Sequence, residues 1–321
     1  MPILNGAMYR LTNTRIKQFT LPVLILSVLC AVLNVCAYVT NAHAMPFYGS
    51  NGREIVLRAE FSTKYSTSSK ERKENIRIAT KSLDGVLIDA GGEFSFNRTV
   101  GERTEKRGYK TAKVIVDGEF VDGVGGGVCQ VSTTVYNAVL LASLSVTEYH
   151  PHSLAVSYVA PSFDAMVNSG WADLKFCNDT KSPVIIKATA DGNKLTISIY
   201  GEPLLLSVER RSVVTGEIAI PKDAEEFDEN GEYPELYEGE RLTVKKGKAG
   251  LTSEGYVVIK ENGKVKEVKK LRSDKYKPIQ GKVIIGKAVR EEVIPPEEDF
   301  LTEDTGGGLD FIKILEKIFK L

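Results

Sequence analysis

A single cysteine closely follows a glycine-rich turn in the stretch Gly123-Val-Gly-Gly-Gly-Val-Cys129-Gln-Val-Ser-Thr-Thr134. The apolar residues after it predict a helix from Gln130 to Leu144, so Cys129 lies at the start of that helix. Backbone N–H groups and the positive end of the helix dipole stabilise a thiolate at such a position. The glycines before it, Gly126 and Gly127 among them, allow the backbone of another chain to come close. We therefore take Cys129 as a candidate nucleophile.

Two histidines follow the expected helix. A cysteine hydrolase or acyltransferase needs a base near the thiol and a group that orients this base. His150 and His152 come shortly after the helix, where the chain can return towards the helix start, and Asp164 follows them. We expect the histidines to move protons and Asp164 to orient an imidazole. The alternative is structural, with each histidine satisfied in a core and Asp164 capping a turn.

The expected helix also supplies the remaining groups of an acyl-transfer site. Ser132 and Thr133 lie one turn into it and are expected to line the site. The backbone N–H groups of Cys129 and Gln130 are expected to hold an oxyanion. No cofactor and no metal are expected. A zinc site made of the cysteine and the two histidines lacks a clear fourth ligand, and no Gly-Lys-Ser/Thr follows the glycines as in a phosphate-binding loop.

The N-terminus carries the features of an export signal. Basic residues precede an apolar run from Leu21 to Val39, which leads to Asn41-Ala-His-Ala44. This order predicts a signal peptide over residues 1–44 that is cleaved after Ala44, with an uncleaved membrane anchor as the rival interpretation. Either interpretation puts the rest of the chain outside the cytoplasm.

Export affects how the cysteines are interpreted. Cys30 and Cys36 belong to the signal, which leaves Cys129 and Cys177. An exported pair can form a disulfide, and this is the main structural alternative for Cys129. The two cysteines lie in different local contexts, which favours one reactive thiol and one incidental thiol.

The charge pattern argues against a nucleic-acid partner. The 321 residues include 42 Lys+Arg and 42 Asp+Glu, and the two signs are interspersed. No basic patch with interleaved aromatic residues is present in the sequence.

Hydrophobic patterning predicts a mixed α+β domain over residues 52–201, with the cysteine-bearing helix central and packed against antiparallel strands. A second helix is expected from Lys70 to Leu83, after capping side chains in Ser66–Ser69. Turn signals at Asp117-Gly118 and Asp191-Gly-Asn193 predict hairpins. Strands are expected at 86–89, 93–97, 113–116, 119–121, 154–159, 173–176, 184–188 and 195–200.

A change of composition after Pro203 predicts a small all-β module over residues 204–290. Its expected strands include Tyr256–Ile259 and Val283–Ile285, with turns at Glu229–Gly231 and Glu261–Lys264. Residues 291–308 are expected to form a linker. Residues 309–321 form an amphipathic helical pattern, which suits contact with a membrane or docking onto the protein itself.

Several short motifs between residues 52 and 201 match one family pattern. They are Glu60–Thr63, Arg72–Ile78, Gly92–Asn97, Gly108-Tyr109, Gly125–Thr134, His152-Ser153, Val156–Tyr158 and Asp164-Ala165. On these residues the segment resembles the VanW family, which is named for a protein of vancomycin-resistance clusters. The resemblance implies a cell-wall protein, and some family members are regarded as cysteine L,D-transpeptidases that make 3-3 cross-links in peptidoglycan. It further implies that Cys129 is the nucleophile and that His152 is the motif histidine, with His150 in a position that relatives often share. Cys177 is not expected from the family pattern.

A second set of short motifs lies in residues 204–290: Gly255-Tyr256, Asn262-Gly263, Leu271–Asp274, Tyr276, Pro278 and Ile285-Gly286. On these residues the segment resembles the G5 module that often follows a VanW domain. This resemblance implies adhesion to wall glycan through a β-rich surface without catalytic residues.

We expect an exported enzyme of the cell envelope, secreted or anchored in the membrane. Its partners would be peptidoglycan stem peptides and, through the G5-like module, wall glycan, with membrane contact at the N-terminal segment or C-terminal helix. One alternative is a wall-binding accessory protein without turnover, in which Cys129 is a small buried residue. The other is a cysteine peptidoglycan hydrolase, in which water releases the same thioester.

Overall fold

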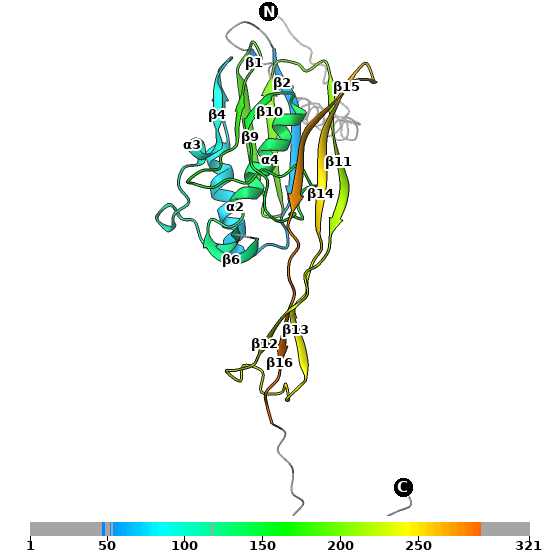
Figure 1. Cartoon of the computed structure of the whole chain (residues 1–321). Coiled ribbons are helices and arrows are strands. Elements are labelled where there is room, and N and C mark those ends of the chain that lie inside the picture. The colour runs from blue at the N-terminus through cyan, green and yellow to red at the C-terminus, as the bar shows by residue number, and fades with distance from the viewer. Residues whose placement is uncertain (1–46, 49–51, 53, 117, 290–321) are drawn as a thin grey trace, which may run out of the picture. The chain divides into compact units, whose positions relative to one another are not determined.

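The computed structural model describes residues 47–48, 52, 54–116 and 118–289 (Figure 1). The expected signal peptide or anchor (1–44), linker (291–308) and C-terminal helix (309–321) lie outside the described residues. The chain forms two compact units. The first contains the residues up to Lys222 together with Lys246–Gly281, and the second contains Asp223–Lys245 and the residues from Lys282 onward.

A five-stranded antiparallel sheet forms one layer of the first unit. In one of its central strands, the buried residues Val184, Ile186 and Ala188 alternate with more exposed neighbours, so one face of the sheet is packed. The hairpin predicted at Asp191-Gly-Asn193 is confirmed. The strand order is β1 (Phe47–Tyr48), β2 (Glu54–Lys64), β10 (Lys194–Gly201), β9 (Val184–Ala190) and β3 (Val86–Ile88).

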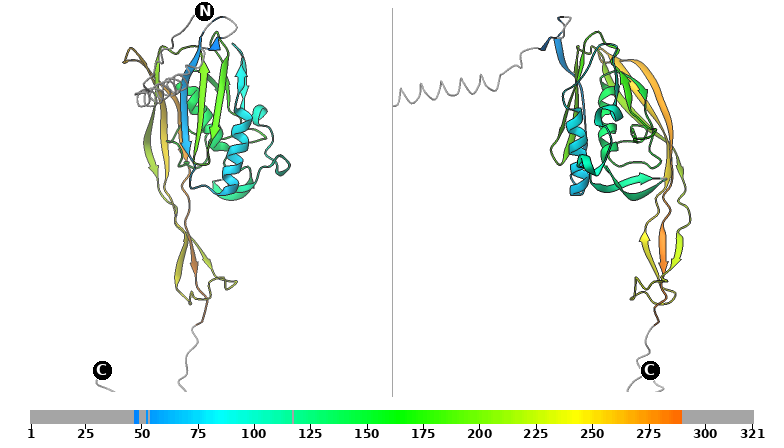
Figure 2. Two further views of the ribbon diagram at one scale, coloured as in Figure 1. Left: turned by 180° about the vertical axis from the view of Figure 1, so that it is seen from behind. Right: turned by 90° about the vertical axis from the view of Figure 1, so that its left-hand side faces the viewer.

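Helices α2 (Lys70–Leu83) and α4 (Val128–Leu141) pack on this sheet and against each other (Figure 2). The bounds predicted for α2 are confirmed, and the helix begins where the side chain of Ser69 accepts a hydrogen bond from the N–H of Arg72 at 3.2 Å. Helix α4 contacts β2 and β10, and nearly all of its residues are buried. A helix that is buried on every side belongs to the centre of a core.

A second antiparallel sheet belongs to the same unit. Its strands are β11 (Ser207–Ile218), β14 (Gly250–Glu261) and β15 (Lys264–Tyr276), with β14 in the middle. The turn predicted at Glu261–Lys264 joins β14 to β15, and Asn262 and Gly263 there have positive φ. Because β11 also contacts α4, this helix lies between the two sheets.

The smaller elements of the first unit include a hairpin, a further three-stranded sheet and short helices. Strands β5 (Thr111–Val116) and β6 (Glu119–Val124) form the hairpin that the sequence predicts. A three-stranded sheet has the order β4 (Glu93–Ser95), β8 (Lys175–Cys177) and β7 (Ser145–Glu148). The short helices are α3 (Phe96–Val100) and the 3₁₀ turn η1 (Glu105–Arg107).

The second unit contains one small sheet. Strand β16 (Lys282–Ile285) lies between β12 (Ala224–Phe227), which runs parallel to it, and β13 (Arg241–Lys245), which runs antiparallel.

Several local predictions differ from the structure. The helix predicted from Gln130 to Leu144 spans Val128–Leu141, and the strand predicted at 173–176 spans Lys175–Cys177. The strand expected at 154–159 is wrong, because this segment has no strand pairing and the backbone before it is bound by the side chain of Asp164. The strand expected at 93–97 ends at Ser95, whose hydroxyl caps α3 by accepting a hydrogen bond from the N–H of Arg98. Strand β2 was not expected, since its polar residues hide the alternation that a half-buried strand shows.

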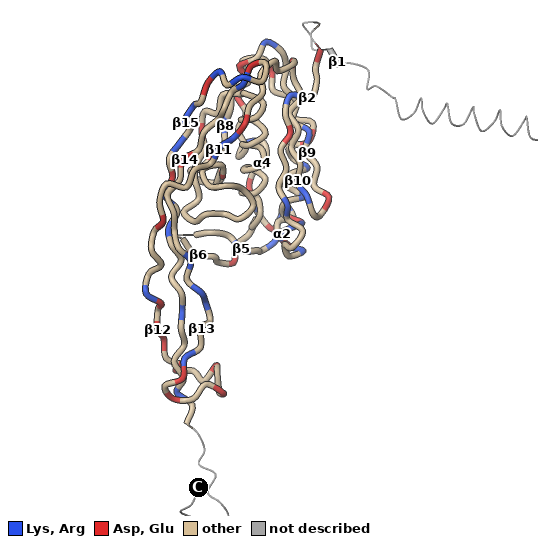
Figure 3. Tube along the Cα trace, turned by 90° about the vertical axis from the view of Figure 1, so that its right-hand side faces the viewer, with Lys and Arg blue, Asp and Glu red and all other residues tan. Residues whose placement is uncertain are grey.

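The fold is broadly α+β, with mostly strands and few helices. Basic and acidic residues are interspersed along the strands (Figure 3). None of the helices in the described ranges is both long and apolar enough to span a bilayer.

Candidate active site

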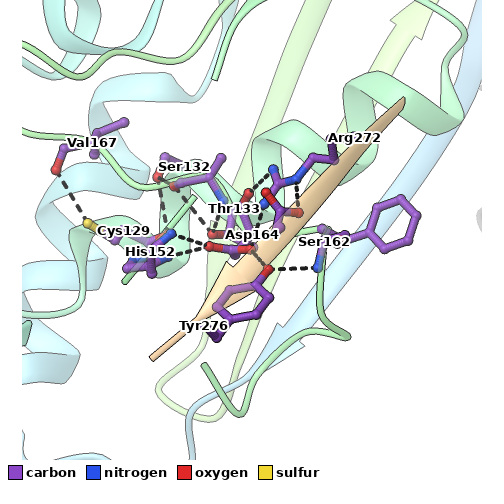
Figure 4. Close-up of polar contacts among 12 residues, drawn as sticks. Cys129, Ser132, Thr133, His152, Ser162, Asp164, Val167, Arg272 and Tyr276 are labelled. Carbon is purple, nitrogen blue, oxygen red and sulfur yellow. Dashed lines mark hydrogen bonds and ion pairs between the residues drawn. The ribbon is translucent and has the colours of Figure 1, made fainter. Parts of the chain in front are cut away.

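Cys129 is the second residue of α4 and is partly exposed. The turn before it uses left-handed backbone conformations, with φ of 89° at Gly125 and 109° at Gly127, which favour glycine. The thiol donates a hydrogen bond to the backbone oxygen of Val167 at 3.4 Å (Figure 4).

His152 and Asp164 come together with this cysteine. The Nδ1 atom of His152 and the backbone N–H of the same residue each lie 2.7 Å from Oδ2 of Asp164 (Figure 4). Both side chains are almost completely buried, with exposed fractions of 5% for His152 and 1% for Asp164. A carboxylate that accepts from Nδ1 leaves Nε2 of the ring for proton exchange with the thiol.

The thiol and the imidazole shift each other's proton affinity. Burial opposes ionisation of Cys129, but a hydrogen bond with His152, the charge of this ring and the charge of Arg103 lower the pKa of the thiol. Burial also opposes the charged form of His152, yet Asp164 and Cys129 raise the pKa of the ring to about 9. The two shifts together favour a thiolate beside an imidazolium.

Two residues of β15 bind the other oxygen of the Asp164 carboxylate. Oδ1 of Asp164 accepts hydrogen bonds from Arg272 at 2.8 Å and from the hydroxyl of Tyr276 at 2.6 Å. Burial alone would raise the pKa of Asp164, but His152, Arg272 and Tyr276 together lower it to about 2. The carboxylate is therefore ionised and held from both sides.

Sequence reasoning did not assign Arg272 and Tyr276 to the site. Both belong to the G5-like pattern, and no local signal connected them with the cysteine motif. Arg272 is buried between Asp274, with Nε at 2.6 Å from Oδ2, and the rings of Tyr136 and Tyr149. A guanidinium buried this completely requires a carboxylate partner.

Ser132 and Thr133 bind the backbone next to Asp164. The hydroxyl of Ser132 donates to the oxygen of Ala165 at 2.6 Å, and the hydroxyl of Thr133 accepts from the N–H of Ala165 at 3.0 Å. These contacts tie the loop of Asp164 to α4.

The groups expected to hold an oxyanion have different surroundings. The N–H of Gln130 is bound to the oxygen of Gly127 at 3.0 Å, and its side chain donates to Thr63 and to the oxygen of Lys64. The N–H of Cys129 has no hydrogen-bond partner within the described part of the chain. Of the two expected donors, the N–H of Cys129 is therefore the one available to an oxyanion.

Gly126 packs within its own chain. A Cβ atom on Gly126 would lie 2.6 Å from the oxygen of Lys113 in β5, and the side chain of Asn75 donates to the Gly126 oxygen at 2.9 Å. The close approach at this glycine is thus made by β5.

His150 lies apart from this group. Its Nε2 is 3.0 Å from Oε1 of Glu148, and its ring contacts Trp171 edge-on at 5.2 Å between centroids. Cys129 and Cys177 are both free thiols. In the regions that the structure describes, no group of three or more His, Cys, Asp or Glu side chains is arranged to hold a metal ion.

Two families match the chain. Residues 71–200 match the family described as "VanW like protein", and residues 213–288 match the family described as "G5 domain". A solved structure of the G5 domain of an IgA1 protease is 18% identical, covers 26% of this chain and 92% of that chain, and has a TM-score of 0.18.

Two curated relatives are similar over part of the chain. The uncharacterized protein YoaR of Bacillus subtilis (strain 168) is 38% identical over 164 residues, which are 51% of this chain and 54% of YoaR. The vancomycin B-type resistance protein VanW of Enterococcus faecalis (strain ATCC 700802 / V583) is 30% identical over 134 residues, which are 40% of this chain and 48% of that protein. The chain spans about half the length of these curated relatives.

The two family matches indicate a protein of the cell-wall-associated class. The chain carries a VanW domain, which is followed by a G5 domain.

Proposed function

We propose that the chain is an exported cysteine L,D-transpeptidase that forms 3-3 cross-links in peptidoglycan. The observation that carries this proposal is the buried pair of His152 and Asp164, joined at 2.7 Å, whose ring lowers the pKa of the Cys129 thiol. A partly exposed thiol, a raised imidazole pKa and a buried carboxylate on Nδ1 are the groups that a cysteine acyltransferase needs.

In the first half-reaction, the Cys129 thiolate attacks the carbonyl carbon of the L-centre in a stem tetrapeptide. A carbon–sulfur bond forms, and the N–H of Cys129 donates to the developing oxyanion. When the tetrahedral intermediate collapses, the amide C–N bond breaks and the His152 imidazolium gives its proton to the departing nitrogen. D-alanine leaves, and the donor remains as a thioester beside a neutral imidazole.

In the second half-reaction, the side-chain amine of a neighbouring stem attacks the thioester carbon. Neutral His152 accepts a proton from this amine, and collapse of the intermediate breaks the carbon–sulfur bond. The new amide is the cross-link, and the site returns to a thiolate and an imidazolium. Asp164 keeps the ring oriented and remains ionised throughout, in keeping with its pKa of about 2.

The decisive experiment compares the Cys129→Ala and Cys177→Ala variants of the full chain with defined muropeptides, read by mass spectrometry. Cys129→Ala should reduce cross-link formation by about 10³-fold or more because the nucleophile is lost, while Cys177→Ala should retain it. Undiminished cross-linking by Cys129→Ala would rule the mechanism out.

The same assay separates the two alternative functions. Equal consumption of the donor with and without an amine acceptor would mean that water takes the acyl group, which defines a hydrolase. Binding of muropeptides without consumption, together with slow labelling of Cys129 by thiol reagents, would mean a wall-binding accessory protein. Either outcome contradicts the transpeptidase proposal.

We also propose that residues 1–44 act as the signal peptide or anchor, that catalysis belongs to residues 52–201, and that residues 204–290 contact wall glycan. The VanW and G5 matches support a cell-wall location. The apolar N-terminal run supports export.

A further inference from the structure

Two arginine side chains, Arg72 and Arg103, lie near enough to Cys129 to interact with it electrostatically, and neither forms an ion pair with a carboxylate among the described residues. Arg72 belongs to α2. Its guanidinium donates to the hydroxyl of Ser68 at 3.0 Å and to Oε1 of Gln130, the neighbour of Cys129, at 2.9 Å. Both of these acceptors are neutral.

Arg103 approaches from the segment between α3 and η1. It donates to Oδ1 of Asn97 at 2.6 Å and to the hydroxyl of Ser169 at 3.1 Å. Ser169 is two residues after Val167, whose backbone oxygen accepts the hydrogen bond of the Cys129 thiol. The acceptors of this second guanidinium are also neutral.

The glycine turn before Cys129 makes room for both arginine side chains. A Cβ atom on Gly127 would lie 3.0 Å from Cγ of Arg72, and one on Gly125 would lie 3.0 Å from Cβ of Arg103. The stems of the two arginines therefore rest on the turn that presents the thiol. Besides adopting left-handed backbone conformations, the glycines therefore leave space for the two arginine side chains.

The anionic form of Cys129 acts on both arginines and the Asp173 carboxylate acts on Arg103, but neither guanidinium forms an ion pair with a carboxylate among the described residues. Burial is the largest influence on both guanidinium groups and lowers the pKa of Arg72 and of Arg103, while the anionic form of Cys129 acts in the opposite direction on each. The hydroxyl of Tyr109, which interacts electrostatically with Arg103, is buried and has no hydrogen-bond partner in the part of the chain described. A half-buried cation pair of this kind is stabilised when an anionic ligand binds.

We propose that Arg72 and Arg103 form an anion-binding pair that holds the C-terminal carboxylate of the peptide donor. The identity of the donor rests on the proposed function. In a stem tetrapeptide, the leaving D-alanine carries its carboxylate one carbon away from the scissile nitrogen, so attack by Cys129 brings this carboxylate close to the two guanidinium groups. Planar guanidinium groups match the geometry of a carboxylate. The pair thus selects donors that end one residue after the bond that is broken.

A test that needs no peptide substrate compares two alkylating agents at Cys129, anionic iodoacetate and neutral iodoacetamide. The full chain is used, and alkylation of Cys129 is followed by peptide mass spectrometry. We expect the ratio of the iodoacetate rate to the iodoacetamide rate to exceed that of free cysteine by about fivefold to tenfold. Because any change in thiolate content affects both agents, the ratio isolates the attraction of the anion.

Arg72→Gln and Arg103→Gln should each lower this ratio severalfold, and the corresponding lysine variants should keep part of it. Arg77→Gln is the matched control, since it removes the same charge from α2 at a site paired with Glu74. An unchanged ratio in both glutamine variants, or the same loss in the Arg77→Gln control, would overturn the proposal.

The role in substrate selection is tested with a tetrapeptide donor as the free acid and as the C-terminal amide. The wild-type chain should use the acid at least about tenfold better, and Arg103→Gln should remove most of this preference. Equal use of both donors by the wild type would overturn the inference while the transpeptidase function stands. If neither donor is used, the proposed function fails, and the alkylation ratio still decides whether the anion pair exists.

Discussion

The Cys129 thiol and the His152 imidazole favour each other's charged forms. The pKa of the thiol is lowered and that of the ring is raised to about 9, because the charge on each partner stabilises the charged form of the other. Asp164 adds to the effect, because its ionised carboxylate stabilises the protonated ring. The electrostatics of this pair therefore favour transfer of the thiol proton to the ring.

We predict that transfer activity falls as pH rises through about 9, where His152 loses the proton that the leaving amine needs. On the acid side, protonation of the thiolate removes the nucleophile. In His152→Gln, iodoacetamide alkylation of Cys129 should require higher pH than in the wild type, and transfer should drop by about 10²- to 10⁴-fold.

His150→Gln is the matched control for this pH profile, since His150 pairs with Glu148 away from Cys129. Its alkylation profile should follow the wild type. If His152→Gln also followed the wild type, or if His150→Gln shifted as strongly, the assignment of the proton-transfer residue would be wrong.

At the scale of elements, α4 carries polar residues in a buried helix, and their side chains are hydrogen-bonded within the helix or to neighbouring segments. Asn137 donates to the backbone of Thr133 and Phe163, and Thr134 donates to the backbone of Gln130. The start of this helix is fixed from outside by Asn75 of α2, which binds both Gly126 and Lys110. The position of Cys129 therefore depends on the fit between α2, α4 and β5.

We predict that Gly126→Ala destabilises the protein, because its Cβ would meet the backbone of Lys113 and Ala112 at 2.6–2.9 Å. Backbone of a paired strand cannot shift cheaply, so the free energy of unfolding should fall by about 1–3 kcal/mol in denaturant titration. Gly170→Ala is the control, since its nearest atom is 3.4 Å away. Equal stability of Gly126→Ala and the wild type would mean that the close packing does not constrain the turn.

At the scale of the whole chain, the candidate site draws on residues that match two different families. Cys129, His152 and Asp164 fall within residues 71–200, and Arg272 and Tyr276 fall within residues 213–288. The strand that supplies the last two belongs to the same compact unit as the site. A chain cut between the two matched regions would leave the buried Asp164 carboxylate without these donors.

We predict that Tyr276→Phe weakens transfer by about tenfold and shifts the pH profile of Cys129 alkylation. The variant removes a donor from Oδ1 of Asp164 and an acceptor for the N–H of Ser162, so the carboxylate holds His152 less firmly. Tyr256→Phe on β14 is the control, because its hydroxyl binds Glu254 instead. A loss of thermal stability in Tyr276→Phe with an unshifted pH profile would limit Tyr276 to a structural role.

The residues of the reactive group could be predicted because their signals are local. A glycine turn before an apolar helix indicates a thiol at a helix start, and a capped, amphipathic run marks α2 within its observed bounds. Which of two neighbouring histidines meets the cysteine has no such signal, since His150 and His152 differ only in the partners that folding brings to them.

The amino-acid sequence alone identified the candidate cysteine, the helix that carries it, the hairpins and the family resemblance. Each of these is visible in short stretches of residues that are close together along the chain. Only the tertiary structure decided that Asp164 is held by Arg272 and Tyr276 and that two arginines without an ion-paired carboxylate in the described ranges lie near the thiol. The hydrogen bonds that hold Asp164, and the one from Arg72 to Gln130, join residues 58 to 112 positions apart. A buried charge selects its partner by proximity in space, and the spacing of residues along the chain does not encode that proximity.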